Sequence, residues 1–317
     1  MEHSPFLTSE KIVCSNHLLS RAQKLKKPNV VIANAGSVLP MSAALEATKI
    51  GIMTPIFVGD IKAIEKEAED LNWDITNFEI IAAKGEHESA KVAAKVCGCA
   101  HGDILMKGDL HSDIFMKATL TKESGLRTGR RLVHSFFITH PSDRRPLLIS
   151  DAAVNIKPNL VTRKEATRFA VETLHILGNS RPKVAFLSAT EVPTETMESS
   201  VEAATLCEWA RKEIKNADFS GPLALDLILS PKSAKVKGFS ENRVAGKADA
   251  IIVPDIVSGN TIFKALVYLS GGCAAGIVNG AKVPILLTSR SDPSAARIAS
   301  VALANILRVE SNLQNSA

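Results

Sequence analysis

The chain has 317 residues, of which 45% are hydrophobic and 22% charged, and its formal net charge is +5. This length predicts two domains, and the composition is that of an ordinary globular protein with enough apolar material for large cores. Acidic and basic residues are mixed along the whole sequence and only 4% are aromatic, which argues against a nucleic-acid-binding protein, because such proteins gather basic charge on one face and stack bases on aromatic rings.

Short apolar runs recur along the chain and predict β-strands. They are too short for helices and too uniformly apolar for strands with one face in water, so we expect strands buried on both faces. In chain order the runs are residues 30–33, 55–58, 78–82, 104–106, 136–139, 147–149, 184–187, 225–229, 250–253, 276–278 and 283–287.

Helical periodicity lies between many of these runs. Residues 61–71 and 166–177 repeat apolar side chains every three or four positions, and Gly178 provides a C-terminal stop. Asp292 and Pro293 offer an N-cap and a first-turn proline for a helix that runs through residue 306. The alternation predicts an α/β fold with mostly parallel sheets, in which ligands bind beyond the carboxyl ends of the strands.

Membrane and metal-binding classes find no support in the sequence. No apolar run reaches the roughly 18 residues of a membrane span, and the N-terminus lacks a signal-peptide pattern, so we expect a cytoplasmic protein with no membrane partner. The five cysteines fit neither a disulfide framework nor a zinc site, and Cys97 and Cys99 are separated by a single residue. We expect reduced, buried thiols and no metal.

Two polar segments in the first half of the chain suit an anionic ligand. Residues 106–113 follow an expected strand and open an expected helix, where a glycine permits close backbone approach and the helix start offers free N–H groups. Residues 125–131 hold three arginines and two glycines, and guanidinium groups bind phosphate in forked pairs. An ordinary strand-to-helix turn and a basic surface loop are the plainer alternatives.

Two further segments lie in the second half. Residues 253–260 lead from a strand end through a Pro-Asp turn to a helix start, which would bring Gly259 and free N–H groups to a phosphoryl group. Residues 287–292 place a hydroxyl, a guanidinium and a carboxylate within four positions, a combination that suits acyl-phosphate chemistry. The alternatives are a capped turn without a ligand and an Asp292 that serves only as an N-cap.

Other chemistry-bearing motifs are absent. The sequence has no Walker-type loop, and no glycine fingerprint of a dinucleotide fold follows residues 30–33. It also lacks a Gly-x-Ser-x-Gly elbow, which argues against a hydrolase.

Together the four polar segments resemble the phosphate acetyl/butyryltransferase family. Residues 107–113 resemble its Lys-Gly-x-x-His-Thr-Asp motif, and residues 125–131 with the nearby His134 resemble its Gly-Leu-Arg-Thr-Gly-Arg-Arg segment. Residues 254–260 are similar to its Pro-Asp-x-x-x-Gly-Asn, and residues 283–290 match its closing motif. The sequence looks closest to the branch sometimes fused behind an enoyl-CoA hydratase-like domain.

The resemblance implies a fold and an assembly. It implies two three-layer α/β domains with mostly parallel sheets, similar to those of isocitrate and isopropylmalate dehydrogenases, with the active-site cleft between them. Residues 1–140 and 280–317 would form the first domain and residues 141–279 the second. Homodimers are usual in the family, so we expect one here.

The resemblance also implies a reaction: acetyl-CoA and inorganic phosphate are converted reversibly to coenzyme A and acetyl phosphate. Coenzyme A is a substrate, no cofactor stays bound, and the thiolate attacks the acyl group directly while both substrates are held. The candidate catalytic residues are Ser289, Arg290 and Asp292. The candidate phosphate- and substrate-binding residues are Lys107, His111, Lys117, Arg127, Arg130, Asp255, Gly259 and Asn260.

One departure from the family pattern concerns the base. Well-studied acetyl-specific members carry an aspartate seven residues after the serine, a position that Ala296 occupies here. Asp292 resembles the pattern of the butyryl-like branch, and we expect it to take the thiol proton or to tune Ser289 so that the serine hydroxyl can take it. Other short acyl groups, butyryl above all, remain alternative substrates, since two methylenes differ by only about 1.6 kcal/mol when buried.

Two further alternatives stay open at this point. A catalytically degenerate family member would bind acyl-CoA as a regulator. A dehydrogenase of related architecture would need clustered aspartates for a divalent metal, and no such acidic cluster lies near a strand end.

Overall fold

The computed structural model describes residues 6–141, 145–287 and 292–315, with side chains as far as residue 310. The chain divides into two compact units: unit 1 consists of Met1–Ile12 and Arg131–Ala274, and unit 2 of Val13–Arg130 and Ala275–Ala317. It passes from one unit to the other after residues 12, 130 and 274, where the sequence led us to expect only two passages, near 140 and 280. The assignment of these units to the two expected domains, with a cleft, stays a prediction.

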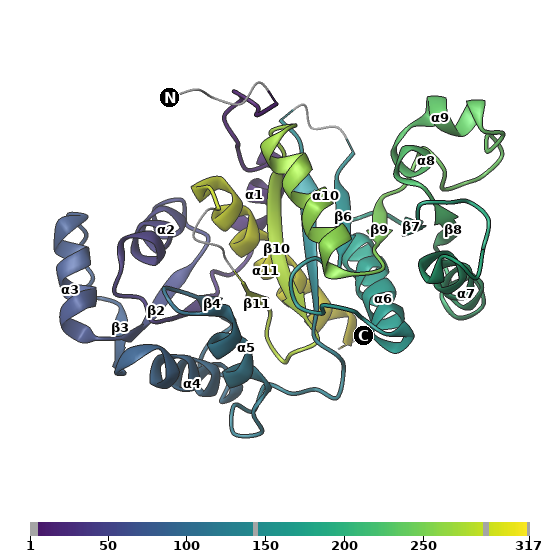
Figure 1. Ribbon diagram of the computed structural model, residues 1–317. Coiled ribbons are helices and arrows are strands. Elements are labelled where there is room, and N and C mark those ends of the chain that lie inside the picture. The colour runs from purple at the N-terminus through teal and green to yellow at the C-terminus, as the bar shows by residue number, and fades with distance from the viewer. Residues whose placement is uncertain (1–5, 142–144, 288–291, 316–317) are drawn as a thin grey trace. The chain divides into compact units, whose positions relative to one another are not determined.

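Unit 2 is an alternation of strands and helices (Figure 1). Its strand order is β3-β2-β1-β4-β11-β10. Neighbouring strands run parallel except β10 and β11, which are antiparallel. The elements are α1 (Asn16–Gln23), β1 (Asn29–Ala33), α2 (Val38–Lys49), β2 (Thr54–Gly59), α3 (Ile61–Asp70), β3 (Glu79–Ala82), α4 (Gly85–Gly98), β4 (Ile104–Lys107), α5 (Ser112–Leu120), β10 (Cys273–Asn279, mostly in this unit), β11 (Ile285–Leu286) and α11 (Ser294–Asn315).

Local sequence explains these elements. The Asp60 carboxylate accepts a hydrogen bond from the Ala63 N–H at 2.9 Å and starts α3. Strands β1, β2 and β4 are buried along nearly their whole length, as expected. Residues 78–82 are the exception, because β3 ends the strand order and is partly exposed, so the expectation of burial on both faces was wrong there.

Unit 1 has the strand order β5-β6-β9-β7-β8. Strands β5 and β6 are antiparallel, and the remaining neighbours are parallel. The elements are β5 (Val133–Thr139), β6 (Leu147–Ser150), α6 (Leu160–Ile176), β7 (Lys183–Leu187), α7 (Glu198–Glu213), β8 (Asp218–Leu223), α8 (Leu225–Leu229), α9 (Pro231–Val236), β9 (Ala250–Ile252) and α10 (Ile256–Tyr268). The expected α/β class with mostly parallel pairing is therefore confirmed.

One expected strand in unit 1 is a helix. Residues 225–229 form α8, and the strand of this region is β8, at residues 218–223. A five-residue apolar run has no periodicity that separates a buried strand from a short helix. Strand β8 escaped detection because its sequence contains an aspartate, a serine, a glycine and a proline beside only two apolar residues, Phe219 and Leu223.

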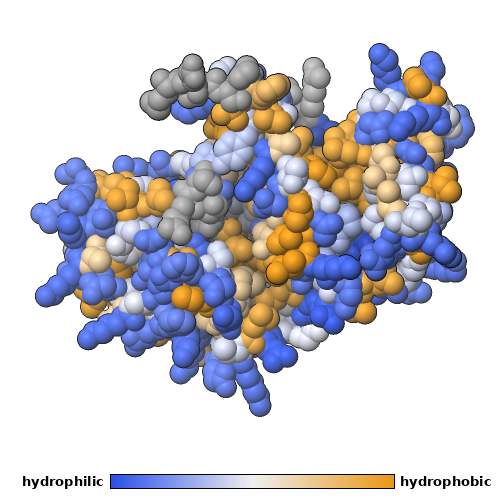
Figure 2. Space-filling view, in the orientation of Figure 1, coloured by the Kyte–Doolittle hydropathy of each residue, from blue (hydrophilic) through white to orange (hydrophobic). Residues whose placement is uncertain are grey.

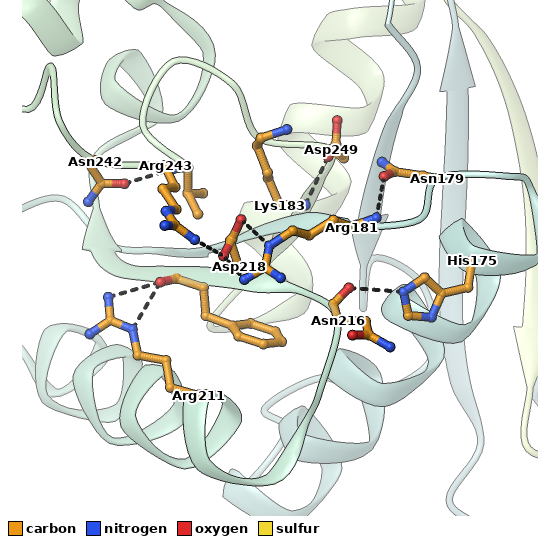
Figure 3. A network of polar contacts seen from close by, with 12 residues as sticks. His175, Asn179, Arg181, Lys183, Arg211, Asn216, Asp218, Asn242, Arg243 and Asp249 are labelled. Atoms are coloured by element: carbon orange, nitrogen blue, oxygen red, sulfur yellow. Dashed lines mark hydrogen bonds and ion pairs between the residues drawn. The ribbon is translucent and has the colours of Figure 1, made fainter.

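The amino-terminal ends of β7, β8 and β9 carry a network of paired polar groups (Figure 3). The Asp218 carboxylate accepts two hydrogen bonds from the Arg181 guanidinium, at 3.0 and 2.8 Å, and lies 3.6 Å from that of Arg243. The Asp249 carboxylate accepts the Lys183 N–H at 2.8 Å. The bonds from Arg181 are the main reason that the pKa of Asp218 is lowered.

Figure 2 shows hydrophilic residues over much of the face drawn, with apolar residues in separate groups. Within residues 6–315, apart from the two internal gaps, no helix has both the length and the apolar character needed to cross a membrane.

Candidate functional site

In unit 2 the carboxyl ends of the parallel strands β1 and β4 lie together. Lys107 is the last residue of β4, and its side chain is buried. The N–H groups of Gly108 and Asp109 donate to the carbonyls of Ala33 and Asn34 at 2.9 and 3.0 Å. A Cβ on Gly108 would lie 2.3 Å from the Ala33 oxygen. The glycine is therefore required for this contact within unit 2, whatever ligand it also approaches.

His111 forms the N-cap position of α5, which begins at the next residue, as the sequence predicted. Its N–H donates to Glu86 at 2.7 Å, and its ring Nδ1 lies 2.8 Å from the same carboxylate. These contacts, with the backbone bond first, lower the pKa of Glu86. Further along α5, Lys117 is exposed and pairs with Asp113 at 3.3 Å. Substrate binding by His111 and Lys117 stays a prediction, since the structure pairs each with a carboxylate.

The arginine-rich loop is held in place by its backbone. Arg127 forms an isolated β-bridge with Ala281, and the Thr128 hydroxyl donates to the Gly280 carbonyl at 2.6 Å. The side chains of Arg127 and Arg130 are exposed on this anchored loop. The structure thus presents both guanidinium groups at the surface of unit 2, and phosphate binding by them stays a prediction.

The strongest catalytic candidates lie largely outside the described residues. Ser289 and Arg290 belong to residues 288–291, which the structure does not describe, whereas Asp292 is described and half-buried. Helix α11 begins at Ser294, and the Pro293 carbonyl accepts its first hydrogen bonds, from Ala296 at 3.0 Å and from residue 297 at 3.4 Å. The helix therefore begins one residue after Pro293, where the sequence predicted its start.

Ala296 faces the interior of unit 2, with 6% of its surface exposed. Its N–H donates to the Pro293 carbonyl, and its own carbonyl accepts the Ser300 hydroxyl at 2.8 Å. A buried methyl group at this position cannot accept a proton. The structure therefore gives no substitute at the position where acetyl-specific relatives carry their aspartate.

In unit 1 the loop after β9 leads into α10. Asp255 is the N-cap, and its carboxylate accepts the Ser258 N–H at 2.8 Å and the Ser258 hydroxyl at 3.0 Å. The helix starts at Ile256, whose N–H donates to the Ile156 carbonyl at 3.1 Å. Residues 258–260 thus lie inside the first turns of the helix, not at its start as expected. Two of the amide donors expected for a phosphoryl group are already bonded within unit 1.

Gly259 packs against the loop that follows β6. A Cβ here would lie 2.8 Å from the Asp151 carbonyl oxygen and 2.9 Å from the Ala152 Cα. Asn260 adds a 3.4 Å hydrogen bond from its Nδ2 to the Ala152 carbonyl. The glycine therefore has a packing role, and ligand binding by Asp255, Gly259 and Asn260 stays a prediction.

The loop after β6 is organised by the Asp151 carboxylate, which the sequence did not single out. One oxygen accepts the N–H groups of Ala153 and Val154 at 3.0 and 2.9 Å. The other accepts the His134 N–H at 3.1 Å and the Asn155 side chain at 2.5 Å. Both oxygens of this buried carboxylate accept hydrogen bonds from the surrounding loop and strand, so Asp151 has a structural role.

Two buried side chains at this edge keep nitrogen atoms that have no hydrogen-bond partner among the described residues. Both ring nitrogens of His134, and Nε and Nη2 of Arg163, have no hydrogen-bond partner there. Of the Arg163 nitrogens, Nη1 donates a hydrogen bond to the Glu202 carboxylate at 2.9 Å. Burial lowers the pKa of Arg163, and Glu202 and Asp255 oppose that shift. An arginine three residues before Ala166, in the apolar stripe of α6, is the sequence signal that could have revealed it.

Within the described part of the chain, no group of three or more His, Cys, Asp and Glu side chains could hold a metal ion. The cysteines are free thiols, as expected, but Cys99 is exposed and not buried. Burial raises the pKa of Cys14 to about 11 and raises that of Cys97 still further, so neither is a ready nucleophile.

The fold and these strand ends define an α/β protein with polar, anion-suited segments beyond buried parallel strands. A model of the phosphate acetyl/butaryl transferase family matches residues 90–305. A phosphate acetyltransferase of Rickettsia prowazekii is 38% identical over 304 residues, covering 95% of this chain and 86% of the relative. The chain therefore belongs to the phosphate acetyl/butyryltransferase family.

The chain is also similar to members of that family named for other acyl groups. A phosphate butyryltransferase of Clostridium beijerinckii is 34% identical, covering 92% of this chain and 97% of the relative. The crystal structure of a branched-chain phosphotransacylase from Enterococcus faecalis superposes with a TM-score of 0.78 at 28% identity, covering 89% of this chain and 99% of that one. The family shares this fold across relatives named for different acyl groups.

Proposed function

We propose that the chain is a phosphate acetyltransferase, which converts acetyl-CoA and inorganic phosphate reversibly to coenzyme A and acetyl phosphate. The observation that carries this proposal is the 38% identity to a phosphate acetyltransferase along nearly the whole chain. The four polar segments of the sequence supply the residue types that the reaction requires.

The chemistry is a direct transfer. The coenzyme A sulfur bonds to the carbonyl carbon of acetyl phosphate, the bond from that carbon to the phosphate oxygen breaks, and phosphate leaves with the electron pair. A thiol with a pKa of about 8.5 is only a few per cent ionised at neutral pH, so a base that takes its proton speeds the reaction. Negative charge grows on the carbonyl oxygen and on phosphate, which calls for cations and hydrogen-bond donors.

The catalytic roles follow from residue chemistry. Ser289 orients the thiol, Arg290 stabilises the developing charge, and Asp292 accepts the thiol proton. The observation that supports Asp292 is that it is the carboxylate nearest in sequence to Ser289 and Arg290. The buried Ala296 cannot take that role.

Substrate binding uses the polar strand ends. Lys107, His111, Lys117, Arg127 and Arg130 supply positive charge or donors in unit 2 for phosphate and the coenzyme A phosphates. In unit 1 the α10 end at Asp255, Gly259 and Asn260 contributes to substrate binding as well. Several N–H groups at the start of α10 are already hydrogen-bonded within unit 1, so we expect this segment to shape the site more than to bind charged groups.

Phosphate butyryltransferase is the second candidate function. Two observations favour it. The sequence has an aspartate at position 292 and an alanine at position 296, which resembles the butyryl-like branch, and the chain is 34% identical to a relative named phosphate butyryltransferase. Identity to acetyl-named relatives is somewhat higher, so acetyl is the substrate that we propose.

We further propose that the enzyme works in the cytoplasm as a homodimer and without a bound cofactor. The exposed apolar side chains of Ile156, Val161 and Val257 support a dimer, since they leave 76%, 59% and 70% of their surfaces in water. The bond from Ile256 to Ile156 keeps two of these segments adjacent in unit 1. Sedimentation of the wild type and of Val257→Asp would test whether this surface joins two copies.

The experiment for the proposed function is a comparison of acyl donors. Phosphate-dependent release of free thiol would be followed with acetyl-, propionyl- and butyryl-CoA under identical conditions. We expect the highest kcat/KM with acetyl-CoA. A higher value with butyryl-CoA would shift the assignment to the second candidate, and no release from any of the three by folded protein would overturn both.

A further inference from the structure

His134 occupies an unusual position for a histidine. It is the second residue of β5, and because β5 runs antiparallel to β6, it lies at the carboxyl end of β6. Parallel pairing of β6 with β9 and of β9 with β7 places it at the edge where ligands of α/β proteins bind. None of its surface is exposed.

The backbone of His134 is fully used, whereas its ring is not. Its N–H donates to Asp151 at 3.1 Å, and its carbonyl accepts the Ser150 hydroxyl at 2.9 Å. Neither ring nitrogen has a hydrogen-bond partner among the described residues. A buried polar atom without a partner destabilises a fold by about 1–3 kcal/mol, so such groups are rare and call for an explanation.

The neighbouring carboxylate does not explain the ring. Asp151 accepts bonds from four residues, His134 among them through its backbone N–H, and makes none to the imidazole. Burial lowers the pKa of His134 to about 4, and the nearby Asp151 carboxylate opposes this shift only weakly. The imidazole is therefore neutral at physiological pH and has one N–H donor and one acceptor available.

The neighbours of the His134 ring are aromatic. The His134 ring meets Phe136 edge-on, with ring centroids 4.3 Å apart, and Phe136 stacks on Phe263 of α10 at 3.8 Å. A phenylalanine or leucine at position 134 would match these neighbours and leave no polar atom unpaired. A histidine that lowers stability at the ligand-binding edge indicates a role in ligand recognition.

We propose that His134 contacts the acyl group of the substrate: its ring N–H donates a hydrogen bond to the acyl carbonyl oxygen, and Phe136 and Phe263 line the place of the acyl chain. An uncharged donor among aromatic rings suits an uncharged carbonyl better than a phosphate dianion. The bond strengthens as the oxygen gains charge when the C–S bond forms and the C–O bond to phosphate breaks. No proton moves to His134, which stays a donor throughout.

This inference rests on the proposed acyl transfer, and three variants separate it from a structural role. His134→Phe removes the donor and keeps an aromatic ring, and His134→Gln keeps an N–H donor. His175→Phe is the matched control, because its ring Nε2 is paired, with the Asn216 carbonyl at 3.1 Å, at the amino-terminal edge of unit 1. For each variant, kcat, the KM for phosphate and Tm would be measured.

We expect His134→Phe to lower kcat by about 100-fold, the effect of losing one oxyanion donor, with little change in the KM for phosphate. Its Tm should rise by about 2 °C or more, since two unpaired polar atoms are removed. His134→Gln should recover part of kcat, and His175→Phe should lower Tm without changing kcat. Near-normal kcat in His134→Phe, or a lower Tm in that variant, would overturn the inference.

A second readout does not depend on turnover. The ring nitrogens of isotope-labelled His134, assigned by comparison with His134→Phe, should shift in the NMR spectrum when acetyl phosphate binds and remain unshifted with inorganic phosphate alone. If the wild type binds acetyl phosphate with this shift but transfers no acyl group, the proposed function fails and the acyl contact stands. If the enzyme is active and the ring does not shift, the acyl contact fails and the proposed function stands.

Discussion

The two edges of the strand set in unit 1 treat polar groups in opposite ways. At the amino-terminal ends of β7, β8 and β9, the polar groups of Figure 3 are joined in pairs, such as Arg181 with Asp218 and Asp249 with the Lys183 N–H. At the carboxyl ends, His134 and Arg163 keep buried nitrogens without partners among the described residues. Paired groups stabilise a fold, whereas unpaired buried groups lower its stability and are retained where a ligand uses them.

The carboxyl edge of unit 1 holds both structural residues and residues with unused hydrogen-bonding atoms. Residues that hold the carboxyl-edge loops together, such as Asp151 and Gly259, sit beside groups with spare hydrogen-bonding capacity. Changes to the amino-terminal edge should therefore alter stability alone. Changes to catalytic groups at strand carboxyl ends should alter turnover, with little or no loss of stability.

The largest effect is expected at Asp292. Asp292→Asn keeps a side-chain oxygen but removes the base, so kcat should fall by about 100- to 10,000-fold with Tm unchanged. Initial rates of thiol release and a thermal melt on the same preparation check this. A variant that melts and turns over like the parent would leave Asp292 with a structural role only, and His111 and Asp255 would become the candidate bases.

Arg290 comes next. Arg290→Ala should lower kcat by about 100-fold or more, because a cation next to developing negative charge is lost, while the fold stays intact. Arg181→Ala is the control at the amino-terminal edge: it breaks the pair with Asp218 and should lower Tm slightly with no change in kcat. Equal turnover in the two variants would contradict the division of roles.

Protonation of His134 should make the carboxyl edge acid-sensitive. Its pKa in the folded chain is about 4, below the value of 6.5 usual for histidine, so the unfolded chain binds more protons between these two pH values. As pH falls from about 6.5 to 4, the free energy of unfolding of the wild type should drop by up to about 3 kcal/mol relative to His134→Phe. Urea titrations at several pH values measure the difference, and parallel pH profiles for the two proteins would refute it.

A smaller effect is expected from Gly259→Ala. The added Cβ would meet backbone atoms of Asp151 and Ala152 below 3 Å, so α10 must shift, and the free energy of unfolding should fall by about 1–3 kcal/mol. Denaturant midpoints measure this. Unchanged stability would mean that the glycine has no packing role and that a ligand alone requires it.

Much of the fold could be predicted from the sequence because buried parallel strands read as uniform apolar runs. Residues 30–33 and 104–106 fall within the observed strands β1 and β4, and the turn from Lys107 to α5 has the expected form. Residues 225–229 could not be placed, since a run of five apolar-rich residues fits a short helix as well as a strand. The polar composition of β8 concealed it for the complementary reason.

The site was only partly predictable. Motifs singled out Lys107, His111 and the α10 segment because glycines and charges next to strand ends are visible in sequence, and substrate binding by these residues stays a prediction. Asp151 and Arg163 were missed, since their importance lies in burial and in which hydrogen bonds they make, and neither property is encoded locally. Glu86 and His111, which are hydrogen-bonded to each other, lie 25 residues apart in the chain, so no local sequence pattern could have predicted their contact.

The most direct test of the account is phosphate-dependent thiol release from acetyl-CoA, measured side by side on the wild type and Asp249→Ala. The account predicts acetyl transfer by both with the same kcat at a temperature where both are folded. It also predicts a free energy of unfolding about 1–3 kcal/mol lower in the variant, which leaves the Lys183 N–H unpaired. Absence of transfer in the folded wild type, or a fall in kcat in folded Asp249→Ala, would contradict it.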